Sequence, residues 1–134
     1  MAAESPPITD QTRHTQTITA DEIEQFAALS GDENPVHLDE SAAADTRFGE
    51  RIAHGILVAG SISAALAKIE GTVIYLDQDL SFERPVYVGD DVTAVCELEA
   101  DLGGGRYRYA TTVVNQDGDV VIDGSAVVLV EPAD

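Results

Sequence analysis

The stretch at residues 56–69 carries apolar or small side chains around the whole circumference of the helix that it is predicted to form. Only Ser61, Ser63 and Lys68 interrupt it, and they leave almost no polar face. A helix that is apolar all round either lies in a protein core or crosses a membrane. A crossing needs about 20 consecutive apolar residues, and this run is well short of that. We therefore expect a central helix, buried on nearly every side, and no membrane partner.

The chain before this helix is predicted to hold one short strand and further helical segments. Residues 15–18 alternate weakly, as a strand does. Thr19 and Glu22 have the spacing of a capping box, and Gly31 is placed to end the helix that follows. Asp39 is expected to cap a second, short helix.

The chain after Gly71 is predicted to be all strand. Branched and aromatic side chains alternate with polar ones, and glycine-containing turns separate the runs. The strands are expected at residues 72–76, 92–98, 107–113 and 120–130, with further alternation at residues 80–88. The order is then strand, helix, loop, buried helix and four consecutive antiparallel strands. A meander wrapped around one helix is the natural packing, which is an α+β hot-dog fold.

Length and composition bound the domain count and the cellular setting. The 134 residues suffice for one domain with a core, expected to span residues 1–134 with loose tails at about 1–7 and 131–134. Cys96 is the only cysteine, so neither an intrachain disulfide nor a cysteine metal site is expected. The first residues lack the pattern of a secretory signal, which favours a cytoplasmic location.

The charge excludes some partners. Twenty-five acidic residues against seven lysines and arginines give a net charge of −18. Such a field repels nucleic acid and anionic membrane surfaces, so neither is expected as a partner. An acidic, lysine-poor composition favours work in concentrated salt, where self-repulsion is screened, and so indicates a halophilic protein.

A dense turn after the first long helix holds the candidate chemistry. Asp32, Asn34 and His37 lie in it, and Pro35 stiffens the backbone that presents His37. Histidine changes protonation near neutral pH, and a nearby carboxylate can accept a hydrogen bond from water. Composition alone would make Asp32 a surface acid and His37 a loop histidine. Asn34 is expected to tie down the turn through hydrogen bonds to the backbone.

Two motifs resemble the MaoC-like (R)-specific enoyl-CoA hydratases. Residues 30–37, SGDENPVH, are similar to that family's signature, and residues 53–57, AHGIL, resemble the start of its central helix. Residues 80–90, LSFERPVYVGD, resemble its following strands. The resemblance covers about residues 20–130. It implies a hydro-lyase that reversibly hydrates a trans-2-enoyl-CoA to an (R)-3-hydroxyacyl-CoA. It also implies no metal or redox cofactor, and a homodimer whose sheets join edge to edge with acyl-CoA near the subunit interface.

The resemblance also assigns roles. It implies that Asp32 and His37 hold the same catalytic water, and which of them acts as base stays open. Gly55, at the start of the central helix, is the candidate oxyanion donor, because first-turn amides lack helical acceptors and the helix dipole favours negative charge. Gly55 also permits a tight entry to the helix. Ser63 is a candidate to orient the acyl chain or Asp32, or is a small packing residue. His54 is expected to satisfy the helix start.

Other readings of the same residues stay open. A hot-dog acyl-CoA thioesterase would usually place a carboxylate on or beside the central helix, and residues 56–67 contain none. A non-catalytic acyl-CoA-binding module would bind ligand without needing the Asp32 and His37 pair.

The phosphates of CoA call for local positive surface, for which Arg84, Arg106 and Arg108 are candidates.

Overall fold

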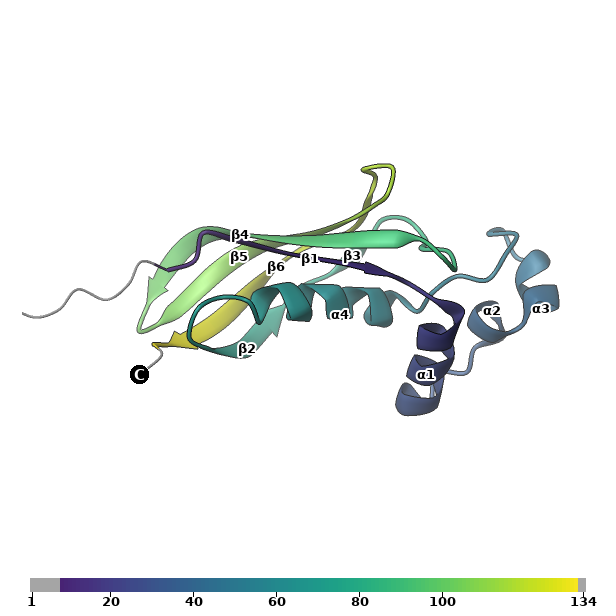
Figure 1. The fold of residues 1–134 in the computed structure, drawn as a ribbon, viewed down its shortest axis with the longest axis horizontal. Coiled ribbons are helices and arrows are strands. Elements are labelled where there is room, and N and C mark those ends of the chain that lie inside the picture. Colours follow the sequence, from purple (N-terminus) through teal and green to yellow (C-terminus); the bar gives the residue numbers. More distant parts are fainter. Residues whose placement is uncertain (1–7, 133–134) are drawn as a thin grey trace, which may run out of the picture.

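The computed structural model describes residues 8–132, and it consists of a curved antiparallel sheet with one long helix along its inner face (Figure 1). That helix is α4, Gly55–Leu66. The shorter helices gather at one end of the sheet: α1 is Ala20–Ser30, α2 is Pro35–Leu38 and α3 is Glu40–Ala44. The sheet and the helix confirm the predicted hot-dog fold. None of the described helices is long and apolar enough to cross a membrane.

The sheet has six strands in the order β1-β4-β5-β6-β2, and the short β3 pairs with β6. Every pairing is antiparallel. The strands are β1 (Gln11–Thr17), β2 (Thr72–Gln78), β3 (Ser81–Phe82), β4 (Asp91–Gly103), β5 (Arg106–Asn115) and β6 (Val120–Glu131). Glu131 pairs with Thr72 at the end of β6. Residues 1–7 and 133–134, within the predicted tails, lie outside the described residues.

The predicted run of four meander strands is wrong in one respect. Only β4, β5 and β6 are hairpin neighbours, whereas β2 lies beyond β6 at the sheet edge and β1 pairs with β4 at the other edge. Gly124 shows how closely the segment after β2 approaches β6. A Cβ atom at that glycine would clash with the backbone oxygen of Asp79. The pattern of side chains predicts strands, but it does not say which strands are neighbours.

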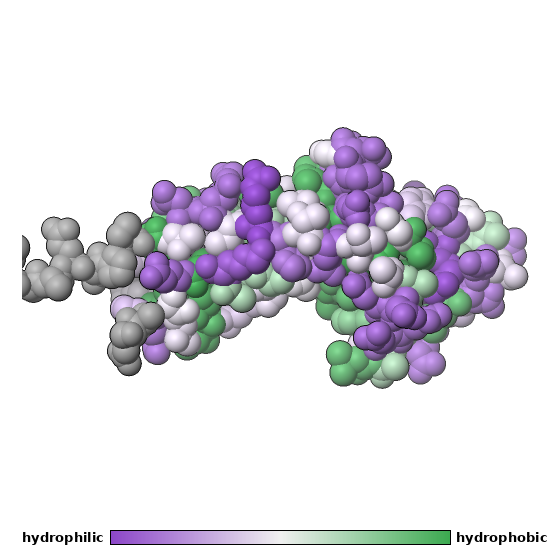
Figure 2. All heavy atoms as spheres, viewed as in Figure 1, coloured by the Kyte–Doolittle hydropathy of each residue, from purple (hydrophilic) through white to green (hydrophobic). Residues whose placement is uncertain are grey.

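Helix α4 is buried on one face only in the single chain, so the prediction of burial on nearly every side is wrong for this state. Val58, Ile62 and Ala65 face the core. On the opposite side Ile56 is 59% exposed, and Gly60 is exposed one turn further on. Hydrophilic side chains cover much of the face shown in Figure 2, and apolar ones reach the surface in patches, including its lower edge where α4 and β2 run.

The predicted ends of α1 are confirmed in detail. The Thr19 side chain accepts a hydrogen bond from the backbone N–H of Glu22, and Gly31 ends the helix with a left-handed φ of 83°. The capping box is only half formed, because a buried carboxylate oxygen of Glu22 has no partner among the described residues. Asp39 caps α3 by accepting from two backbone amides, as predicted.

Candidate active site

The turn between α1 and α2 is held by short-range hydrogen bonds. The side-chain oxygen of Asn34 accepts from the backbone N–H of Val36, and so caps α2. An oxygen of Asp32 accepts from the backbone N–H of Asn34. Pro35 occupies the first turn of α2, where its missing N–H costs nothing. His37 therefore lies in a one-turn helix rather than in a loop.

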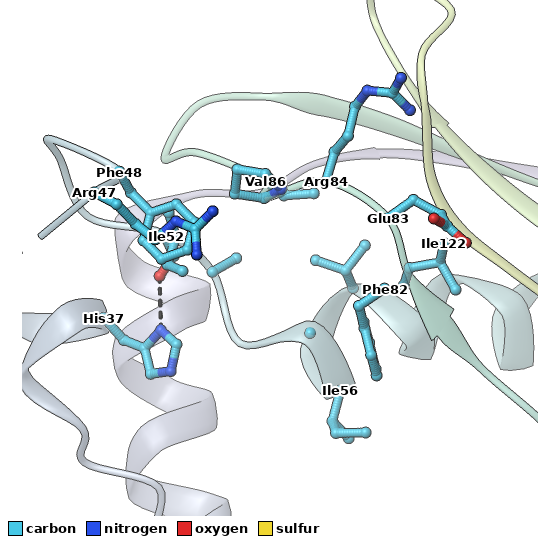
Figure 3. Close-up of a pocket in the computed structure, with 14 residues that line it drawn as sticks. His37, Arg47, Phe48, Ile52, Ile56, Phe82, Glu83, Arg84, Val86 and Ile122 are labelled. Carbon is cyan, nitrogen blue, oxygen red and sulfur yellow. Dashed lines mark hydrogen bonds between the residues drawn. The ribbon is translucent and has the colours of Figure 1, made fainter.

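His37 is nearly buried, and its ring is oriented by one hydrogen bond. Its Nδ1 atom lies 2.8 Å from the carbonyl oxygen of Ile52 (Figure 3). A carbonyl can only accept, so Nδ1 carries a hydrogen, and in the neutral imidazole Nε2 then has the lone pair. That Nε2 atom lies 3.9 Å from Oδ2 of Asp32, whose side chain is half exposed. Arg51 holds the His37 backbone by donating to its carbonyl at 2.7 Å.

His54 packs against this pair. Its ring stacks on that of His37, with centroids 3.9 Å apart. Its Nε2 atom lies 2.9 Å from the backbone carbonyl oxygen of Asp32. The prediction that His54 satisfies the start of α4 is wrong, because its side chain makes no capping hydrogen bond there.

The three side chains of Asp32, His37 and His54 have donor atoms within 4.8 Å of one another, which is close enough to consider a metal ion. A ligated ion lies near the plane of each imidazole, about 2.0–2.1 Å from the nitrogen. The two imidazoles are stacked instead, so their in-plane lone pairs do not meet at one point. The arrangement does not suit a metal ion.

Gly55 is the first residue of α4, so its N–H has no acceptor within the helix. The ring of Phe82 lies over it, since a Cβ atom at Gly55 would be 2.5 Å from the ring. The absence of a side chain thus makes room for this ring. Because no side chain caps α4, its first amides can serve a negatively charged group.

A cavity of about 530 Å³ lies between His37 and Gly55, and Asp32 is not among the residues that line it. His37 and Gly55 line it, and most of its other walls are apolar. In Figure 3 Phe82 and Ile56 lie side by side at one wall, and the guanidinium of Arg84 points away from the interior. The full lining is His37, Arg47, Phe48, Ile52, Ala53, Gly55, Ile56, Val58, Phe82, Glu83, Arg84, Pro85, Val86 and Ile122.

The structure brings some of the predicted residues together and leaves others apart. Ser63 is exposed on the uncovered face of α4 and does not line the cavity. Among the candidate arginines, Arg84 lines the cavity, whereas Arg106 and Arg108 lie on β5 outside its lining. Sequence reasoning missed Arg47, which lies in a loop without a periodic pattern or a motif. Phe82 lies within a recognised motif, but the local sequence does not predict that its ring lies over Gly55.

The arrangement can hold and activate a water. Two atoms 3.9 Å apart are too far for a direct hydrogen bond, but one water can contact both at about 2.8 Å. The lone pair on His37 Nε2 and the carboxylate of Asp32 are both acceptors, so each can take one hydrogen of that water. His37 lines the same cavity as the amide end of α4 at Gly55. An acid–base pair beside a backbone donor suits addition of water to, or its removal from, a carbonyl compound.

Known proteins are similar to this chain in sequence and in structure. An (R)-specific enoyl-CoA hydratase of Aeromonas caviae is 41% identical over 131 residues, which cover 96% of this chain and 98% of the relative. A 3-hydroxybutyryl-CoA dehydratase of Methylorubrum extorquens is 43% identical over 116 residues, 84% of this chain and 73% of that protein. The unliganded R-hydratase PhaJ1 of Pseudomonas aeruginosa superposes with a TM-score of 0.88 at 43% identity, covering 96% of this chain and 84% of that one. The family model for the MaoC like domain matches residues 3–118, and the chain therefore belongs to the MaoC-like family.

Proposed function

We propose that this protein is an (R)-specific enoyl-CoA hydratase, a hydro-lyase that reversibly converts a trans-2-enoyl-CoA into an (R)-3-hydroxyacyl-CoA. The observation that carries the proposal is the 3.9 Å separation of Asp32 Oδ2 and His37 Nε2, because His37 also lines the cavity that contains the start of α4. The hydratase and dehydratase relatives, at 41% and 43% identity, support the same reaction class.

The reaction divides among three groups. A water held by Asp32 and His37 loses a proton to one of them as its oxygen attacks C3 of the enoyl thioester. The electron pair of the double bond moves toward the thioester carbonyl, whose oxygen gains negative charge near the Gly55 amide. A proton then returns from the acid–base pair to C2, so one water is added across the double bond. Positioned acid–base groups contribute about 100- to 10,000-fold, and one oxyanion donor about 100- to 1,000-fold.

The substrate is an acyl-CoA thioester, and the cavity supports its placement. The apolar walls suit the acyl portion, and both Phe82 and Ile56 line the cavity together with Gly55, whose amide would receive the thioester oxygen. Arg47 and Arg84 line the same cavity and provide positive charge for the CoA phosphates. This chemistry uses water and proton transfer, so no cofactor besides the CoA of the substrate is proposed.

We further propose a homodimer, formed through the uncovered face of α4 and the free edge of β2. β2 is a terminal strand of the sheet, and one of its sides is unpaired among residues 8–132. Its central residues Ile74, Tyr75 and Leu76 are each about 40% exposed, and Ile56 on α4 is 59% exposed. Apolar side chains at a free strand edge favour pairing with a second copy. Such pairing would also cover the exposed Ser63, which the single chain leaves without a role.

The thioesterase alternative has less support, because α4 itself carries no carboxylate. Crotonyl-CoA distinguishes the three activities. A hydratase removes the enoyl-CoA absorbance without releasing free thiol, and chiral analysis finds the (R) product. A thioesterase releases free CoA, and a binding module does neither. Activity that survives exhaustive dialysis against a chelator supports the cofactor-free reaction. Absence of hydration across a series of enoyl-CoA chain lengths, at low and high salt, would refute the proposal.

A further inference from the structure

We propose that His54 is a positioning residue, which fixes Asp32 and His37 relative to each other and to the start of α4. The inference rests on the proposed function, since it concerns the same acid–base pair. His54 contacts both members of that pair and directly precedes Gly55 in the chain. It is 2% exposed, so its ring is held inside the protein rather than at the cavity surface.

The first contact is the hydrogen bond to Asp32. The backbone carbonyl of Asp32 accepts from Nε2–H of His54 at 2.9 Å, across 22 positions of sequence. The other hydrogen bonds recorded for Asp32 are local, to Ser30 and Asn34. Among the described residues, the His54 bond is therefore the hydrogen bond that ties this turn to the beginning of α4. The carboxylate itself is half exposed, so its position depends on where the turn backbone is held.

The second contact is the stacking on His37. The two rings lie with centroids 3.9 Å apart and planes 29° apart. Phe26 packs edge-on against His54, with centroids 4.9 Å apart. The His37 ring is thus restrained in its plane by the bond from Nδ1 to Ile52 and from one face by His54. Both restraints keep Nε2 directed at Asp32.

The remaining nitrogen of His54, Nδ1, has no hydrogen-bond partner among the described residues. Because Nε2 carries the hydrogen, Nδ1 is a buried acceptor. An unsatisfied buried polar atom carries a free-energy cost that an apolar ring of similar size would avoid. A side chain needed only to fill space would not require this nitrogen. A histidine at this position is explained if its Nε2–H donor and its aromatic face both position the pair.

Three substitutions separate the two contacts. His54→Phe keeps an aromatic face but removes the donor, His54→Gln keeps a donor but removes the ring, and His54→Ala removes both. We expect kcat to fall about 100-fold in the alanine variant and less in the other two, with KM within about twofold of the wild type. His14, on β1 outside the site, provides the control His14→Gln, which should leave kcat and KM unchanged. Wild-type kcat in both His54→Phe and His54→Gln would overturn the proposal.

Nitrogen NMR of the wild-type imidazoles tests the same inference without turnover. We expect His54 to be protonated at Nε2 and bare at Nδ1, and His37 to be protonated at Nδ1 and bare at Nε2. The opposite tautomer of His54 would overturn the proposal even if every variant failed to fold. In a folded His54→Phe variant, the Glu33 amide and His37 ring signals should shift, and unchanged signals would contradict a positioning role. A wild-type protein that hydrates no enoyl-CoA but has the expected tautomers refutes the proposed function alone.

Discussion

Nε2 of His37 lies 3.9 Å from Oδ2 of Asp32, and the hydrogen bond from His37 Nδ1 to the Ile52 carbonyl makes that Nε2 an acceptor in the neutral ring. The two groups therefore face each other as two acceptors rather than as a hydrogen-bonded donor and acceptor. One water between them satisfies both. This relationship is the basis for proposing that the histidine and the aspartate act together on one water.

Because the two groups act on one water, their loss should not be additive. We expect Asp32→Asn and His37→Gln each to lower kcat by about 100- to 10,000-fold. The kcat of the double variant should be little lower than that of the less active single variant. Steady-state hydration of crotonyl-CoA measures all three. Glu33→Gln is the matched control, because it removes an adjacent exposed carboxylate outside the pair and should retain wild-type kcat. Multiplicative losses in the double variant would show that the two groups act independently.

Gly55→Ala should impair substrate binding and turnover through Phe82. The new Cβ atom would lie 2.5 Å from the Phe82 ring, so the ring has to move. Phe82 is 52% exposed, which lets it move at a stability cost below about 1 kcal/mol. Its displacement alters the cavity wall, and we expect kcat/KM to fall about 10- to 100-fold. In a protein that already carries Phe82→Ala, adding Gly55→Ala should lower kcat/KM by less than it does in the wild type. An equal loss in both backgrounds would place the defect in the Gly55 backbone instead.

The proposed dimer should be sensitive to charge at the free edge of β2. Ile74→Glu places a carboxylate at an apolar interface, so the population should shift to monomer and activity should fall with it. Sedimentation velocity at several protein and salt concentrations measures the shift. Leu29→Glu on α1 is the control, because Leu29 is an 85% exposed apolar residue on neither β2 nor α4. Equal dissociation in both variants would indicate a general effect of added negative charge.

The arginines at the cavity should affect affinity more than turnover. Arg47→Ala and Arg84→Ala are each expected to raise KM for an acyl-CoA by about two- to fivefold, the size of an exposed charge interaction. Arg106→Ala, on β5 outside the cavity lining, should leave KM unchanged. The differences should shrink near 1 M salt, where the screening length is about 3 Å. Equal effects of all three substitutions would show that the arginines act only through the net charge of the protein.

The thiol of Cys96 should be unreactive in the native protein. Its residue is fully buried, and burial raises the pKa of the thiol from 9.0 to about 11. Native protein should therefore react slowly with a thiol reagent at pH 8, whereas unfolded protein should react at once. The unfolded thiol ionises first as pH rises, so this group's contribution to stability is fully present below pH 9.0 and is lost between pH 9.0 and about 11. Denaturant titrations of the wild type and Cys96→Ala across that range measure the difference.

Local pattern and motif were sufficient for the fold class and the family. The apolar circumference of residues 56–69 calls for a central helix, and alternating residues after Gly71 call for a sheet around it. Both expectations are confirmed, as is the recognition of the MaoC-like family from residues 30–37 and 53–57. The caps at Thr19 and Asp39 follow from the sequence because a cap involves atoms only a few residues apart.

Contacts across long sequence separations were decided by the tertiary structure alone. The position of β2 beyond β6, the ring of Phe82 over Gly55 and the stacking of His54 on His37 have no local signature. The tautomer of His37 likewise depends on the carbonyl of Ile52, 15 positions away. Side-chain pattern records which face of an element is buried, but not which partner covers it. Partner choice comes from packing the whole chain, and it turns candidate residues into one site.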